Sequence, residues 1–270
     1  MKKMLLRVTA MVPMMLMAKI HYAKVEPLEQ VTIKSSLSGI VTQANRTAEG
    51  NTLKNETVIQ IDDTLDHANL KNSQDTLVLL QSTLKINREM LKGLQETLQR
   101  KKDFFHRMQK LKTASQTQKD NAFAAWIGAK NQYLGTREKI ISLQKQILDL
   151  RYRITTLKDI ITKKHFAFPG KYLYRLMIHR GEFVAPGMPL AIVSDLSQAQ
   201  LIVFLDPDEM TDTNGTNIRT RSIWIDGKKT DLTIDRIWRV ADDQFISAYR
   251  ARIVLPPHYP YSRLVKIEFR

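Results

Sequence analysis

Apolar residues recur at heptad spacing through the middle of the chain, between residues 65 and 164. Two positions of the repeat, three residues apart, are mostly apolar, which is the a/d pattern of a coiled coil. The first run has Leu77, Leu84, Leu91, Leu98 and Phe105 at one position and Leu80, Asn87, Leu94, Lys101 and Met108 at the other. The second run has Trp126, Tyr133, Ile140, Ile147, Ile154 and Ile161 with Ala122, Ala129, Thr136, Leu143, Leu150 and Leu157. The pattern predicts two long amphipathic helices.

A short polar segment separates the two runs, because residues 112–118 contain no large apolar side chain. Two antiparallel helices can be joined by only a few residues. We therefore predict an antiparallel coiled-coil hairpin over residues 65–164. Arms of about 45 residues would extend about 70 Å at 1.5 Å per residue.

Residues 24–64 and 165–196 show a different pattern, in which apolar residues alternate as they do in half-buried strands. Each stretch contains a related turn, Glu49-Gly50 in the first and Arg180-Gly181 in the second, followed by a buried strand. Gly50 is expected to supply a positive φ. Neither piece is large enough for its own core, so the two should close into one β-sandwich that carries the hairpin as an insertion.

Residues 197–270 alternate again, with strands predicted at 223–227, 232–238, 249–255 and 264–269. A small β-barrel domain is expected here. The predicted fold class is α+β: a long helical hairpin inserted in a split β-sandwich, followed by this barrel.

The N-terminus indicates export from the cell. Met1-Lys2-Lys3 precedes an apolar run over residues 8–18, which is typical of a signal peptide and short for a membrane span. Cleavage after Ala18 or Ala23 is expected, and the alternative is that residues 1–23 stay as a short N-terminal anchor.

Composition narrows the function. The net charge is +15, of which residues 65–164 carry +11, dispersed over the polar helix faces without a phosphate loop or base-reading motif. These are solvated coiled-coil faces rather than a nucleic-acid surface. The chain has no cysteine, which excludes disulfides, thiolate metal sites and a cysteine nucleophile.

The order of elements resembles one family. A glycine-turn half-motif, a long helical hairpin, a second half-motif ending in Pro186-Gly-Met-Pro-Leu190 and a following β region are similar to the periplasmic adaptor proteins, or membrane fusion proteins, of the HlyD family. The resemblance covers about residues 25–270. It implies that the split sandwich is a lipoyl-like domain. It also implies a ring of adaptors at the inner membrane of a Gram-negative periplasm, linking an ABC, RND or MFS transporter to a TolC-like outer-membrane channel for efflux or secretion.

The same resemblance implies a channel-contacting site at the hairpin tip. Family members that dock on such channels carry an Arg, a Leu and a Ser there, which match Arg107, Leu111 and Ser115. Each has a plain structural alternative. Ser115 would be a helix N-cap that accepts a hydrogen bond from the backbone of Thr117 or Gln118, Leu111 would end the seam, and Arg107 would be solvated.

No catalytic motif is visible, so an enzyme is not expected. The six histidines lack metal-site spacing, and no lysine lies in a modification turn, so neither a metal nor a cofactor is predicted. Two alternatives stay open: an exported coiled-coil tether without a transport role, and a carrier domain with a modified lysine.

Overall fold

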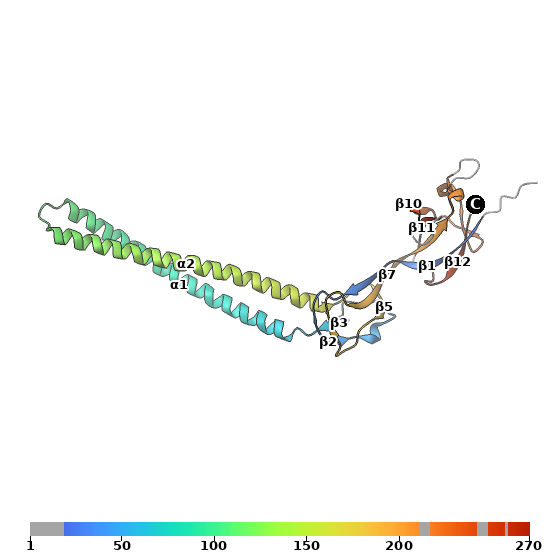
Figure 1. Ribbon diagram of the computed structural model, residues 1–270, viewed down its shortest axis with the longest axis horizontal. Coiled ribbons are helices and arrows are strands. Elements are labelled where there is room, and N and C mark those ends of the chain that lie inside the picture. Colours follow the sequence, from blue (N-terminus) through green and yellow to red (C-terminus); the bar gives the residue numbers. More distant parts are fainter. Residues whose placement is uncertain (1–18, 211–216, 242–247, 257–258) are drawn as a thin grey trace, which may run out of the picture.

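The computed structural model describes residues 19–210, 217–241, 248–256 and 259–270, with backbone only at 239–241. The molecule is elongated: a two-helix rod projects from a small β body, and a second β body follows at the other end (Figure 1). The apolar run predicted as an export signal lies within residues 1–18 and so outside the described residues.

The rod consists of α1 (Thr64–Lys110) and α2 (Gln116–Lys164), of 47 and 49 residues, joined by residues 111–115. Each helix extends about 70 Å at 1.5 Å per residue. The residues buried between them lie at the predicted heptad positions, which confirms the seam: Leu84, Asn87, Ala122, Ala129, Ile140, Leu143, Ile147, Ile154 and Leu157, with Ser73 added near the base. The buried amide of Asn87 donates to the carbonyl of Thr83 at 2.8 Å, whereas Lys101 at the same heptad position is exposed.

The helices leave and re-enter a small sheet side by side. Its strands are β2 (Gly39–Ala44), β3 (Ile59–Ile61), β4 (His165–Phe166) and β6 (Phe183–Val184), in the order β4-β3-β2-β6. Strand β3 precedes α1 and pairs antiparallel with β4, which follows α2. The two ends of a hundred-residue excursion are therefore held by one pair of strands.

Both flanking pieces of chain share the core beside this sheet. Residues of the first piece and of the second are packed together in one buried cluster: Val41, Leu53, Val58, Ile59 and Ile61 with Leu173, Leu176, Ile178, Val184, Leu190 and Val193. The predicted turn is present at Gly50, which has φ +76° and whose N–H donates to the carbonyl of Leu173 at 2.9 Å. Beside it, the carboxylate of Glu49 accepts the N–H of Leu176 at 2.5 Å.

Two long strands continue from this core into the second one. Strand β1 (Ile20–Lys34) pairs with β7 (Pro189–Leu205) across an irregularity at residues 27–29, and β5 (Tyr172–Leu176) flanks β7. The predicted domain limits at 23/24 and 196/197 thus fall inside strands. They fall there because an alternating strand can bury one stretch in one core and the next stretch in another.

The second core lies under a curled sheet. The strand order is β10 (Ile234–Ala241), β11 (Tyr249–Leu255), β7, β1, β12 (Leu264–Phe269), β8 (Ile223–Ile225) and β9 (Lys228–Lys229). Short 3₁₀ turns lie at Arg46–Ala48, Pro207–Glu209 and Ile218–Thr220. The pairings among described residues form an open path, so the predicted small barrel is a half-barrel. Ala23 and Val25 are also buried in this core, although both lie before residue 197, the predicted start of the barrel domain.

Candidate functional site

The hairpin tip presents all three predicted residues to solvent. Helix α1 ends at Lys110, and Leu111 follows in an extended conformation with 48% of its surface exposed. Arg107 is exposed one helical turn earlier and forms no hydrogen bond or ion pair with any described residue. The two side chains are therefore available together at the far end of the rod, where a partner could reach them.

Ser115 has a structural role in the same turn. Its hydroxyl accepts the N–H of Gln118 at 3.3 Å, and the side chain of Gln118 accepts the N–H of Ser115 at 2.9 Å. This reciprocal pair is a capping box, which satisfies two backbone donors at the start of α2. The alternative of an N-cap is confirmed, and contact of Ser115 with a channel stays a prediction.

An aromatic layer closes the seam just below the tip. Phe105 of α1 stacks on Trp126 of α2 with ring centroids 5.2 Å apart, and Phe123 lies 5.4 Å from Phe105. Such contacts add to the burial of the rings themselves. The layer holds the end of α1 against the start of α2, and this packing fixes the position of the turn that carries Arg107 and Leu111.

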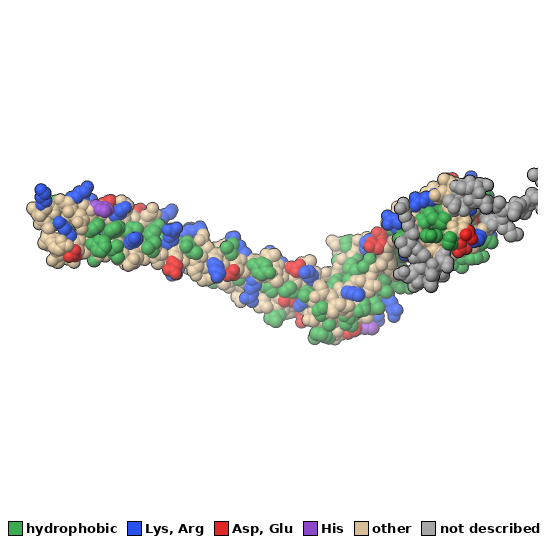
Figure 2. Space-filling model, turned by 45° about the horizontal axis from the view of Figure 1, so that its top comes forward, with side chains coloured by type: hydrophobic (Ala, Val, Ile, Leu, Met, Phe, Trp, Pro, Cys, Tyr) green, Lys and Arg blue, Asp and Glu red, His purple; other side chains and the backbone are tan. Residues whose placement is uncertain are grey.

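The tip is strongly basic. Residues 100–120 contain seven Lys or Arg and two Asp. Blue side chains accordingly crowd the end of the rod in Figure 2. A partner surface with acidic side chains would be favoured here, both in affinity and in rate of encounter.

Each helix also carries apolar side chains outside the seam. Those that recur at the same heptad positions are Leu79, Ile86, Met90 and Phe104 on α1 and Leu134, Ile141 and Leu148 on α2, all at least 44% exposed. We call these sets the α1 stripe and the α2 stripe. Leu65, Val78, Phe123 and Tyr152 are exposed at other positions of the two helices. Figure 2 shows hydrophobic patches along the rod on the face in view.

The stripes lie on opposite faces of the rod. When the two seam positions are labelled a and d, the α2 stripe occupies position b, which is next to e on the helix surface. The α1 stripe occupies positions c and g, which are next to each other on the other side of the seam. In an antiparallel pair the two e positions share one face and the two g positions share the other. The stripes also lie at the same height, since Phe105 stacks on Trp126 and Leu84 lines the same groove as Ile147.

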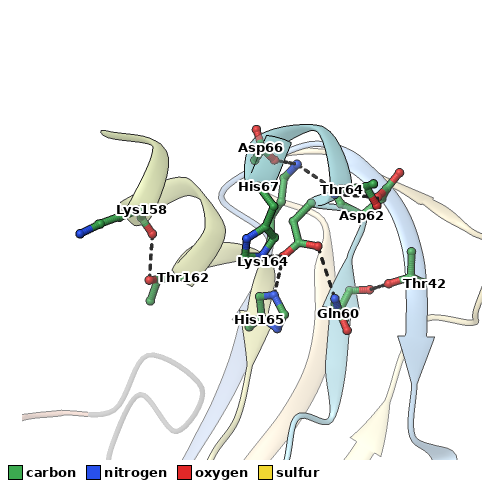
Figure 3. A network of polar contacts seen from close by, with 11 residues as sticks. Thr42, Gln60, Asp62, Thr64, Asp66, His67, Lys158, Thr162, Lys164 and His165 are labelled. Carbon is green, nitrogen blue, oxygen red and sulfur yellow. Dashed lines mark hydrogen bonds and ion pairs between the residues drawn. The ribbon is translucent and has the colours of Figure 1, made fainter. Parts of the chain in front are cut away.

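A second polar constellation lies at the base of the rod, where the helices join the sheet (Figure 3). His165, at the end of α2, points its Nε2 at Oδ2 of Asp63, 2.6 Å away. His67, in the first turns of α1, places its Nε2 3.1 Å from the same oxygen. Gln60 donates to the other oxygen, Oδ1, at 3.4 Å.

Asp63 is buried, with 8% of its side chain exposed. Burial by itself raises the pKa of this carboxyl, but the hydrogen bond and charge of His165, together with Gln60 and His67, outweigh burial and leave the pKa below its ordinary value. Asp63 occupies the N-cap position of α1 without capping it, and the neighbouring Asp62 accepts the N–H of Thr64 at 3.1 Å instead. The carboxylate of Asp63 is thus left to the two imidazoles.

This cluster is not predicted by the sequence pattern. The two histidines are far apart in the sequence, and His67 and His165 are brought together only when the hairpin closes. The spacing of Asp63 and His67, one helical turn apart, was the only local signal.

None of the described helices is long and apolar enough to cross a membrane.

A helical hairpin on two small β bodies is also the architecture of solved structures of membrane fusion proteins. No protein-family model matches the sequence, and no curated protein matches it either. Solved structures of this class do match in fold.

MacA from Actinobacillus actinomycetemcomitans superposes with a TM-score of 0.70 at 15% identity, over 93% of this chain and 78% of MacA. The membrane fusion protein Spr0693 from Streptococcus pneumoniae R6 gives 0.65 at 6% identity, over 94% and 99% of the two chains. A MacA-MexA chimera carrying the α-hairpin domain of MexA from Pseudomonas aeruginosa gives 0.56 at 14% identity, over 94% and 81%. At these identities the likeness concerns the fold.

Proposed function

We propose that this protein is a periplasmic adaptor that links an inner-membrane transporter to a TolC-like outer-membrane channel for efflux or secretion. The observation that supports the proposal most is the rod itself, about 70 Å long, which is held at its base by one strand pair and has its tip residues exposed. A rod of this kind spans a distance and presents a terminal contact surface. The role is mechanical and requires no catalysis or cofactor.

The parts have separate roles in this proposal. The lipoyl-like domain consists of residues 24–64 and 165–196, and the inserted hairpin consists of residues 65–164. The barrel domain consists of residues 197–270 together with the start of strand β1. The apolar N-terminal segment directs export to the periplasm, where the protein associates with the inner membrane through this segment or through its transporter. The transporter would be of the ABC, RND or MFS type.

A ring of copies would bury the two stripes. Because they lie on opposite faces at the same height, the α2 stripe of one copy can pack against the α1 stripe of the next. A two-fold dimer would pair one stripe with itself and leave the other in water. Burying both calls for head-to-tail contacts, which close into rings when the rotation permits.

Substitutions in the stripe test the ring. Ile141→Lys with Leu148→Lys should reduce any oligomer to monomer in light scattering or native mass spectrometry, since two charges would be buried between copies. The control Ser142→Lys adds a cation at the adjacent, exposed position and should leave assembly intact. If the wild-type protein is found only as a monomer in these measurements, at all concentrations and with partners present, the proposed ring is contradicted.

Docking at the tip is tested by Arg107→Asp combined with Leu111→Ser. We expect this variant to lose both export and cross-linking to an outer-membrane channel in intact cells. The control Lys71→Asp, at an exposed position near the base of α1 and outside the basic tip, should keep them. If the tip variant keeps both activities, docking at this site is wrong. An intact rod with no channel partner in any cross-link would favour the alternative, an exported tether without a transport role.

The carrier-domain alternative makes a simple prediction of its own. A covalent cofactor on a lysine would add mass to the purified protein. Intact-mass measurement therefore separates a carrier from an adaptor, for which we expect the mass of the unmodified chain.

A further inference from the structure

The base of the rod carries a set of ligand atoms that no proposed role of the protein uses. Oδ2 of Asp63, Nε2 of His67 and Nε2 of His165 all lie within 4.8 Å of one another. They come from three places in the chain: the residue before α1, the fourth residue of α1 and the residue after α2. We propose that these three residues bind a divalent transition-metal ion of the zinc class, which ties the start of α1 to the end of α2.

The donor set suits such an ion. Two imidazoles and one carboxylate are ligands that Zn²⁺ takes in proteins, with a fourth position left for water. At Zn–N and Zn–O distances of about 2.0–2.2 Å, tetrahedral ligand atoms lie about 3.3 Å apart. The two distances to Asp63 here, 2.6 and 3.1 Å, need to open by less than 1 Å. Rotation of the His67 side chain, which is 58% exposed, can supply much of that adjustment.

The surroundings favour a cation. Gln60 donates to the second oxygen of Asp63 at 3.4 Å, an outer-shell contact that would orient the carboxylate toward a metal. The nearby ammonium of Lys164 is held by Asp66 at 2.5 Å and by the carbonyl of Asp62 at 2.7 Å, so its charge is already paired. Figure 3 shows His67 and His165 converging from the two helices while Lys164 reaches toward Asp66.

Binding would have a mechanical consequence. The metal would join the first turns of α1 directly to the end of α2 and the start of β4, at the junction between rod and sheet. It would restrict the angle at which the rod leaves the β body. For imidazole Nε2 to bind the ion, the ring proton must reside on Nδ1, and both rings can adopt that tautomer.

Metal binding is tested on the full chain without a histidine tag. After treatment with a chelator, the protein is titrated with Zn²⁺ in competition with a chromophoric chelator. We expect one Zn²⁺ per chain, about 100-fold weaker binding for His67→Ala, His165→Ala and Asp63→Asn, and about tenfold weaker binding for Gln60→Leu. His106→Ala, at the other end of the rod, is the matched control and should bind as the wild type does.

The variants remain informative if one of them is destabilised. His67 is the most exposed of the three, so His67→Ala should retain the metal-free circular dichroism and melting temperature of the wild type. Failure of the wild type to bind Zn²⁺ at micromolar concentration would overturn the site, and so would binding that persists in His67→Ala and His165→Ala. Neither result depends on whether the protein docks on a channel.

The clamping role has a separate readout. The chain has no cysteine, so spin labels can be placed cleanly at Lys92→Cys in α1 and at Asn55→Cys in the exposed segment before β3. Zn²⁺ should narrow the distribution of distances between the labels in the wild-type background and leave it unchanged with His67→Ala. Unchanged distributions in both backgrounds would overturn the clamp.

Discussion

Two adjacent residues of α2 provide a sharp test of how the rod is built. Ile147 lies in the seam and is 5% exposed, whereas Leu148 lies in the α2 stripe and is 63% exposed. Each loses three carbon atoms when it is replaced by alanine. The two substitutions therefore remove the same amount of side chain from opposite environments on one helical turn.

The expected costs differ because only one of the side chains is buried within a single copy. Ile147 packs in a cluster with Leu84, Ile140 and Leu143. Removing three buried carbons costs about 2.4 kcal/mol at about 0.8 kcal/mol each, and the cavity left behind raises the cost to about 3 kcal/mol. Leu148→Ala should change the stability of the monomer by less than about 0.5 kcal/mol.

Hydrogen exchange measured by mass spectrometry can localise the effect to the rod. At a dilution where light scattering reports monomer, Ile147→Ala should speed exchange of the backbone amides in residues 77–91 and 140–154 by about 100-fold. Leu148→Ala should leave these rates near those of the wild type. At higher concentration it should instead weaken assembly, since the α2 stripe is proposed to lie between copies.

The refuting result is equally plain. If both variants speed exchange equally in the monomer, or if Leu148→Ala has the larger effect, then Leu148 is buried within one copy. The assignment of the seam and the stripe would then be wrong. The proposed head-to-tail packing would fall with it, whereas the fold of the two β bodies would be unaffected.

Three further predictions concern the tip, the β region and the N-terminus. Ser115→Ala should destabilise the first turn of α2 by about 1 kcal/mol through loss of the cap, seen as faster exchange confined to the tip. The ion pair of Lys171 with Asp195, 2.8 Å apart, holds the pKa of Asp195 below its ordinary value and the pKa of Lys171 above its own, chiefly through their hydrogen bond. The lowered pKa of Asp195 stabilises the fold above about pH 3.9, and this stabilisation is lost as the pH falls through the folded-state pKa; the raised pKa of Lys171 stabilises the fold up to about pH 10.4. Asp195→Asn should therefore flatten both the acid and the alkaline limb of a plot of melting temperature against pH. An unchanged plot would contradict this. Deleting residues 1–23 should lower the melting temperature well below that of a chain beginning at Lys19, because Ala23 is buried and residues 20–24 pair with β12; equal melting temperatures would contradict this.

The same pairing bears on how the chain would be processed. Cleavage after Ala23 would remove Ile20–Ala23 from β1, together with the contact of His21 with Glu209 at 2.8 Å. Cleavage after Ala18 would leave the strand whole. Of the two predicted cleavage sites, the structure therefore favours Ala18.

The two helices and their reversal were predictable from sequence because their causes are local. A heptad period places apolar residues on one face within a few turns, and a polar segment without large apolar residues permits a reversal. The capping box at Ser115 and the positive φ at Gly50 follow from single residues and their neighbours in the same way. The residue pattern also predicted strand β11 at residues 249–255 and β12 at 264–269.

What only the tertiary structure decided depends on contacts between distant parts of the chain. Strands β1 and β7 pass through both cores, and the second sheet follows an open path. Both features depend on which strands pair, and the alternation of apolar and polar residues does not specify strand partners. The cluster of Asp63, His67 and His165 forms because two helices of almost equal length bring the chain back to its starting point. Local patterns set which elements form, and closure of the hairpin onto the β3–β4 pair set which side chains meet.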